Sequence, residues 1–162
     1  DPHILYDSVA EKWRVLACMV GDVGYPAGLY EADEWDGPYK LIAGPAKVNG
    51  TGCLLQKFGS QYYALFGSAD RKFYVYSYPD LKQLGALSMF RPPWDEQSNT
   101  RCWPNVIPLP DGYPAPYIAL SMDRANYPGL DGWTYGALYL YHGHPTDGDR
   151  PEYEYSEHYE SE

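Results

Sequence analysis

The sequence predicts an all-β fold built from repeated antiparallel units, and three observations lead to this prediction. The 162 residues include 18 Tyr, 5 Trp and 4 Phe, which favour strands. The chain also holds 16 Gly and 15 Pro, which interrupt it at short intervals in the way that turns between strands do. A mostly apolar run that begins near an aromatic residue and ends at Asp occurs three times. We therefore expect short strands joined by tight turns.

The recurring run occupies residues 12–22, 61–70 and 116–123. Its final Asp recurs after 48 residues and again after 53 residues. A period of about 50 residues with up to four strands in each unit is typical of propeller blades. The sequence thus predicts a β-propeller of four-stranded antiparallel blades, with about three blades in this chain. Such a set is an incomplete ring or part of a larger propeller.

Each recurring run is expected to form the second strand of its unit. Shorter apolar segments precede the runs at residues 3–6, 53–55 and 105–107, third strands follow at 28–32, 73–77 and 137–141, and outer strands follow at 39–42 and 84–87. One helical alternative exists, because residues 8–11 fit a capping box. The same position in the other units holds Gly59-Ser60 and Asp111-Gly112, which are turn sequences. We therefore predict a strand over residues 13–20.

The predicted blades span approximately residues 1–47, 48–96 and 97–146, followed by an acidic, Tyr-rich tail at residues 147–162. The tail carries −6 of the formal net charge of −10, which leaves −4 for residues 1–146. The tail has no aliphatic residue after Arg150, so we expect it to be solvated or docked on a partner.

The charge and the motifs exclude several classes of function. A net charge of −10 argues against a free-standing nucleic-acid binder, because phosphate backbones require a basic surface. No window offers the roughly 20 apolar residues that a membrane span needs. The sequence has no phosphate-binding Gly loop and no Gly-x-Ser-x-Gly, and we predict neither cofactor nor metal. The three cysteines (Cys18, Cys53 and Cys102) lack zinc-site spacing, and we expect them to be buried in strands.

The chain begins Asp-Pro-His, with neither an initiator Met nor an apolar leader. We expect it to be a processed product, a fragment or a shortened form of a longer protein. No targeting signal can be read from it.

Three stretches together resemble the five-bladed propeller glycoside hydrolases of the family 43, 32 and 130 type. They are Asp-Pro-His-Ile-Leu-Tyr at residues 1–6, Ala-Asp-Glu-Trp-Asp-Gly-Pro-Tyr at 32–39, and the segment 52–65, which ends Tyr-Tyr-Ala-Leu. The resemblance covers about residues 1–142. It implies hydrolysis of glycosidic bonds in an oligo- or polysaccharide by paired carboxylates, with Asp1 as general base. It also implies an extracellular or periplasmic location.

The sequence departs from this family at two points. The family's acidic Glu corresponds to a position near Gly50, where the sequence Asn-Gly-Thr-Gly has no carboxylate. The family also closes its ring with five blades, whereas this chain holds three blade-like units. We therefore expect further blades from the same parent chain or from another subunit, because a terminal unit cannot bury its inner face alone.

The predicted site lies at one face of the blades. In a blade the first strand starts at the face where the antiparallel second strand ends, so residues at these positions should lie close together. Carboxylates there supply proton transfer, Arg orients a sugar, and aromatic planes stack on it. The candidate catalytic residues are Asp1, Asp70 and Asp123, and the candidate substrate-binding residues are Asp22, Arg71, Trp103, Asn105 and Arg124.

Other interpretations of the same residues stay open. An Asp that follows a strand is often a turn former that bonds its own backbone. A non-catalytic carbohydrate-binding propeller, or a structural propeller that assembles with other subunits, fits a chain that has lost the general acid. Hydrolysis fits if the acid lies in a blade outside this chain.

Overall fold

The computed structural model describes residues 1–19, 25–48, 50–67, 72–88, 100–101, 105–113, 115–123 and 138–143. No helix occurs among these residues, and their strands form three sheets in which every pairing is antiparallel. The all-β prediction is therefore confirmed for this part of the chain. The acidic tail predicted at residues 147–162 lies outside the described residues.

Sheet 1 contains four strands in sequence order: β1 (Pro2–Asp7), β2 (Lys12–Cys18), β3 (Pro26–Ala32) and β4 (Lys40–Lys47). The carboxylate of Asp7 stabilises the turn between β1 and β2, because its Oδ1 accepts the N–H groups of Val9 and Ala10 at 3.0 and 3.1 Å. Residues 8–11 thus form a turn and not a helix start, as the comparison of the repeats predicts.

Sheet 2 repeats this order with β5 (Thr51–Phe58), β6 (Gln61–Gly67), β7 (Lys72–Ser77) and β8 (Gln83–Ser88). A two-residue turn joins β5 to β6, and its Gly59 has a φ of 60°. Glycine adopts this left-handed conformation without the steric cost that a Cβ imposes.

Sheet 3 is built from β9 (Thr100–Arg101), β10 (Val106–Pro108), β11 (Tyr117–Asp123) and β12 (Leu138–Gly143). Both β9 and β12 pair with β11 at Met122, so β9 occupies the edge of β11 that β10 also uses. The first strand of this unit is therefore divided into two pieces. The sequence patterns do not predict β9.

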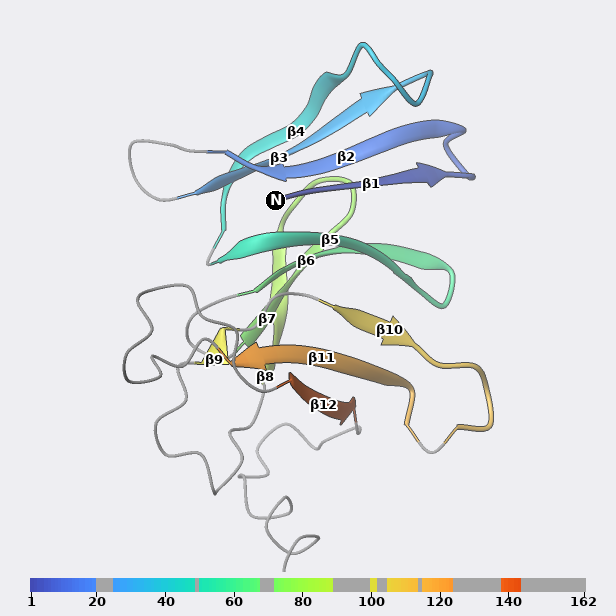
Figure 1. The fold of residues 1–162 in the computed structure, drawn as a ribbon. Coiled ribbons are helices and arrows are strands. Elements are labelled where there is room, and N and C mark those ends of the chain that lie inside the picture. The colour runs from blue at the N-terminus through green and yellow to red at the C-terminus, as the bar shows by residue number, and fades with distance from the viewer. Residues whose placement is uncertain are drawn as a thin grey trace, which may run out of the picture.

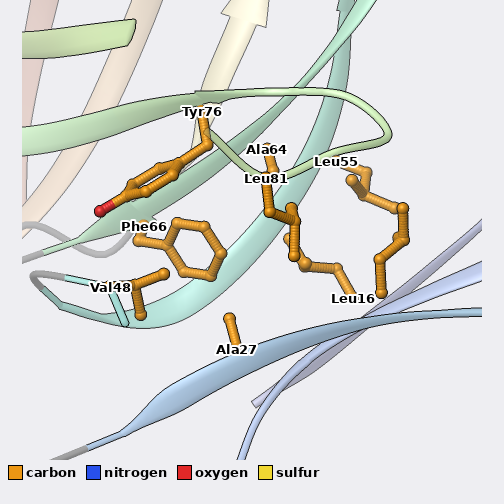
Figure 2. Close-up of a cluster of buried hydrophobic side chains, with 9 residues drawn as sticks. Leu16, Ala27, Val48, Leu55, Ala64, Phe66, Tyr76 and Leu81 are labelled. Atoms are coloured by element: carbon orange, nitrogen blue, oxygen red, sulfur yellow. The ribbon is translucent and has the colours of Figure 1, made fainter. Parts of the chain in front are cut away.

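The three sheets are stacked, with the first strands β1, β5 and β10 as neighbours (Figure 1). A first core fills the space between sheets 1 and 2, and Figure 2 shows its side chains meeting from both sheets. Leu16 and Ala27 enter it from sheet 1, and Leu55, Phe66 and Tyr76 enter it from sheet 2. Phe66 is fully buried, with its ring centroid 5.1 Å from that of Tyr76 in an edge-on contact.

A second core fills the space between sheets 2 and 3. Leu65 and Phe73 of sheet 2 pack with Val106 and Ala119 of sheet 3. Sheet 2 is therefore covered on both faces, which explains why its strands carry large apolar residues at successive positions.

The sheets follow one another with the same orientation. The fifth residue of each recurring run is Leu, at positions 16, 65 and 120. Leu16 points toward sheet 2 and Leu65 points toward sheet 3. Leu120 lies on the outward face of sheet 3, because its strand neighbour Ala119 packs against sheet 2. The stack thus has a direction, which we call its polarity, because each sheet presents the same face to the next sheet.

Both ends of the stack present apolar side chains to solvent. On the outward face of sheet 1, Ile4 is 48% exposed, and Tyr6 and Leu41 are similarly exposed. On the outward face of sheet 3, Leu140 of β12 is 56% exposed, and Ile107 of β10 is also exposed. Because all three sheets have the same orientation, the outward face of sheet 1 corresponds to the face that sheets 2 and 3 each turn toward the preceding sheet. The outward face of sheet 3 corresponds to the face that sheets 1 and 2 each turn toward the following sheet.

Candidate functional site

The starts of the first strands and the ends of the second strands meet at one edge of the stack, which we call the Asp1 edge. Cys18 at the end of β2 contacts Cys53 near the start of β5, so sheets 1 and 2 share this edge. At the opposite edge, which we call the turn edge, the ring of Phe58 at the end of β5 contacts that of Tyr117 at the start of β11. Sheet 3 therefore has the same orientation.

Three of the predicted site residues lie at the Asp1 edge. Asp1 is exposed and directly precedes β1. Asn105 is exposed in front of β10, and its carbonyl oxygen accepts the N–H of Leu120 at 2.9 Å. Asp123 is the last residue of β11 and pairs with Thr100. Asn105 and Asp123 thus share sheet 3, while Asp1 belongs to sheet 1.

The other five predicted site residues are Asp22, Asp70, Arg71, Trp103 and Arg124, and they lie outside the described residues. Their assignment to this edge, and the catalytic and binding roles of all eight residues, stay predictions. Near Gly50, the described residues 50–52 bring no carboxylate to the edge.

An exposed aromatic side chain at the Asp1 edge was not among the predicted site residues. Tyr25 directly precedes β3 and is 54% exposed. A phenol in this position offers an apolar face together with a polar tip. Its place in the sequence Gly-Tyr-Pro, just before a predicted strand, is a signal that could have identified it.

His3 links β1 to β5 close to this edge. Its Nδ1 accepts the N–H of Leu55 at 3.1 Å, which requires that nitrogen to be unprotonated. The half-buried position lowers the pKa of the imidazole, because burial disfavours the charged form. His3 is thus a neutral acceptor that holds sheet 1 against sheet 2.

Cys18 and Cys53 lie in strands as predicted, but they are half-buried and not buried, and both thiols are free. Their sulfur atoms lie 3.2 Å apart across the interface between sheets 1 and 2. The spacing in the sequence contains no signal for this contact, because the two residues belong to different units of the repeat. Cys102 lies outside the described residues.

The turn edge holds a buried polar cluster that the sequence patterns do not predict. Asp7 is 4% exposed and Arg14 is 7% exposed. Tyr78 donates its hydroxyl to Asp7 Oδ2 at 2.5 Å, and Arg14 forms an ion pair with Glu31. The Arg14 guanidinium also lies 5.9 Å from the centroid of the Tyr78 ring. These contacts connect β1 and β2 to the turn after β7.

Hydrogen bonding keeps Asp7 charged. Burial alone raises the pKa of a carboxyl, but the hydrogen bonds from Tyr78 and from two backbone N–H groups, together with Arg14, hold the pKa of Asp7 below its usual value. Burial and the same Asp7 contact raise the pKa of Tyr78. The Tyr78 hydroxyl therefore stays protonated and donates its hydrogen bond at neutral pH. The cluster has a structural role, because it holds sheet 1 against sheet 2.

The described residues define a class of fold, namely an all-β arrangement of three stacked antiparallel sheets with polar and aromatic residues at the Asp1 edge. No family model, curated protein or solved structure matches the chain. Among the described residues no group of three or more His, Cys, Asp or Glu side chains is arranged to hold a metal ion. In that part of the chain, no helix has the length and apolar character needed to cross a membrane.

Proposed function

We propose that the three sheets are consecutive blades of a β-propeller and that the Asp1 edge binds an oligo- or polysaccharide. The observation that carries this proposal is the common orientation of the three sheets, in which β1, β5 and β10 are neighbours and start at one edge. In a propeller the first strands of the blades surround a central channel. Residues at the starts of these strands then lie around one mouth of that channel.

The described residues at this edge have the chemistry that a sugar site uses. Tyr25 offers an exposed ring for stacking on a pyranose, and Asp1 and Asn105 offer polar groups for its hydroxyls. The resemblance to propeller glycoside hydrolases supports the same class of ligand. An extracellular or periplasmic location belongs to the proposal on that resemblance alone.

Hydrolysis of the bound glycoside is the second candidate function. It rests on Asp1, an exposed carboxylate at the position where the resembling family has its general base. The reaction needs a second carboxylate about 5–9.5 Å away, either from Asp70 or Asp123 or from another chain. The absence of a carboxylate at residues 50–52 favours binding without hydrolysis for this chain.

The outward faces of sheets 1 and 3 expose apolar side chains, and we propose that a second copy of this chain covers them. Within one copy, each sheet packs the same face on the next sheet. The outward face of sheet 3 in one copy therefore fits the outward face of sheet 1 in another copy in the same way. This contact is heterologous, because it joins two different faces. Two copies close a ring when sheet 3 of each copy packs on sheet 1 of the other.

Affinity electrophoresis of the full chain through gels that contain plant or bacterial polysaccharides tests sugar binding. We expect retardation in at least one gel, and Tyr25→Ala should weaken it about tenfold, the effect of losing one aromatic anchor. Tyr113→Ala is the matched control, because Tyr113 is 61% exposed but lies at the turn edge. Equal weakening by both substitutions, or no retardation of the unmodified chain, would overturn the assignment.

Incubation with aryl-glycosides and the retained polysaccharides tests hydrolysis separately. If hydrolysis occurs, Asp1→Asn should abolish release of the aryl group, because an amide is no general base. Electrophoretic retardation should persist, because the Asn side chain still forms hydrogen bonds with sugar hydroxyls. Retardation without turnover supports the binding function and rejects the hydrolase for this chain alone.

A further inference from the structure

The contact between Cys18 and Cys53 joins two sheets that have no strand pairing with each other. Cys18 is the last residue of β2 in sheet 1, and Cys53 lies in β5 of sheet 2. Their Sγ atoms are 3.2 Å apart, and Cys18 Sγ also lies 4.0 Å from the carbonyl oxygen of Gly50. A disulfide needs about 2 Å between its sulfur atoms, so the two sulfurs must approach each other by roughly 1 Å more to form the bond.

The two thiols differ in their readiness to react. The hydrogen bond with Cys53 outweighs burial and lowers the pKa of Cys18. The same hydrogen bond, together with burial, raises the pKa of Cys53. Cys18 is therefore the more acidic thiol and the expected nucleophile, and Cys53 is the expected resolving thiol. Both side chains are half-buried, which leaves the pair within reach of a small reagent.

We propose that Cys18 and Cys53 form a reversible disulfide between sheets 1 and 2 when the protein meets a low-molecular-weight disulfide of the glutathione type. The Cys18 thiolate attacks one sulfur of the reagent, forms a mixed disulfide and expels one thiolate, which takes up a proton. Cys53 then loses its proton, attacks Cys18 Sγ and expels the second thiolate. Two protein thiols are oxidised, and one reagent disulfide is reduced to two thiols.

The bond would fasten the end of β2 to the start of β5 at the Asp1 edge. Tyr25 and Asp1 lie at the same edge in sheet 1, so oxidation would hold the sheet that carries them against sheet 2. The bond would close a loop of more than 30 residues, from position 18 to position 53. We expect a rise of roughly 10 °C in the melting temperature from the restricted unfolded chain.

The experiment incubates the full, folded chain with oxidised glutathione, blocks remaining thiols with iodoacetamide and maps the peptides by mass spectrometry. We expect a linked peptide pair that contains Cys18 and Cys53, a higher melting temperature, and reversal of both by dithiothreitol. A link that involves Cys102 instead, or alkylation of Cys18 and Cys53 after oxidation, would overturn the proposal.

Three variants separate the roles of the cysteines. Cys102→Ser should form the link as the unmodified chain does. Cys53→Ser should stop at a glutathione adduct on Cys18, because the resolving thiol is missing. Cys18→Ser should react more slowly at Cys53, and equal adduct formation by these two variants would contradict Cys18 as the nucleophile. None of these measurements depends on sugar binding.

Discussion

The hydroxyl of Tyr78 donates a hydrogen bond to the buried carboxylate of Asp7, with 2.5 Å between the two oxygens. The two residues are 71 positions apart: Asp7 ends β1 of sheet 1, and Tyr78 lies in the turn after β7 of sheet 2. Asp7 also holds the turn between β1 and β2 through Val9 and Ala10. One carboxylate therefore organises a local turn and fastens sheet 1 to sheet 2.

Replacing Tyr78 by Phe should lower the free energy of unfolding by about 1–3 kcal/mol, because the buried Asp7 charge loses its hydroxyl donor. Urea denaturation followed by tryptophan fluorescence measures the change. Tyr113→Phe is the control, since the Tyr113 side chain is exposed in the loop between β10 and β11. Equal effects of the two substitutions would show that the Tyr78 hydroxyl contributes nothing specific.

Asp7 should make the protein sensitive to acid. Its pKa is lower in the folded chain than the usual 3.8, so its contribution to stability is present above about pH 4 and is lost as the pH falls through the lowered pKa. Asp7→Asn should therefore reduce stability at pH 7 and flatten its decline below pH 4. Urea unfolding at a series of pH values measures both effects.

Asp33→Asn serves as the control for this acid dependence. Asp33 forms an ion pair with Lys12, which holds its pKa low, but the pair is exposed and solvent screens it. Its removal should leave the acid decline almost unchanged. If Asp33→Asn flattened the loss of stability below pH 4 as much as Asp7→Asn does, the surface ion pair and not the buried cluster would account for the acid sensitivity.

Phe66→Ala should destabilise the protein by about 3–5 kcal/mol, because it opens a cavity in the core between sheets 1 and 2. Phe66 is fully buried and contacts the ring of Tyr76. Val9→Ala, in an exposed turn, should change stability by less than about 0.5 kcal/mol. Thermal unfolding of both variants provides the comparison, and a small loss for Phe66→Ala would mean that this core is not closely packed.

The second-copy assignment predicts that the chain associates with itself in light scattering. Ile4→Lys on sheet 1 and Leu140→Lys on sheet 3 should each abolish this association, because each contact uses one face from each copy. A mixture of the two variants should form an open dimer through the one intact pair of faces. Val9→Lys should behave as the unmodified chain. A monomeric unmodified chain, or no rescue on mixing, would contradict the assignment.

The strands could be predicted largely because their determinants are local. The run that contains Trp13 and the run that contains Tyr62 both alternate side chains between the two faces of their sheets, and turn residues such as Gly59 mark where the strands end. The divided first strand of sheet 3 could not be predicted in this way, because β9 has two residues and exists through its pairing with β11.

The candidate site was only partly predictable for a related reason. Asp1 and Asn105 were identified from their positions beside first strands, and the structure has both exposed at the Asp1 edge. Tyr25 carries only a weak turn signal. The contact between Cys18 and Cys53 requires knowledge of which sheet packs on which, and no spacing within the chain encodes that.

The sequence by itself determined the all-β class, the repeat and the position of most strands, because hydrophobic alternation and turn chemistry act over a few residues. Only the tertiary structure decided that Asp7 lies beneath Tyr78, that Cys18 meets Cys53, and that apolar faces remain open at both ends of the stack. These relationships depend on how whole sheets pack, and that packing arises from contacts between residues far apart in the chain.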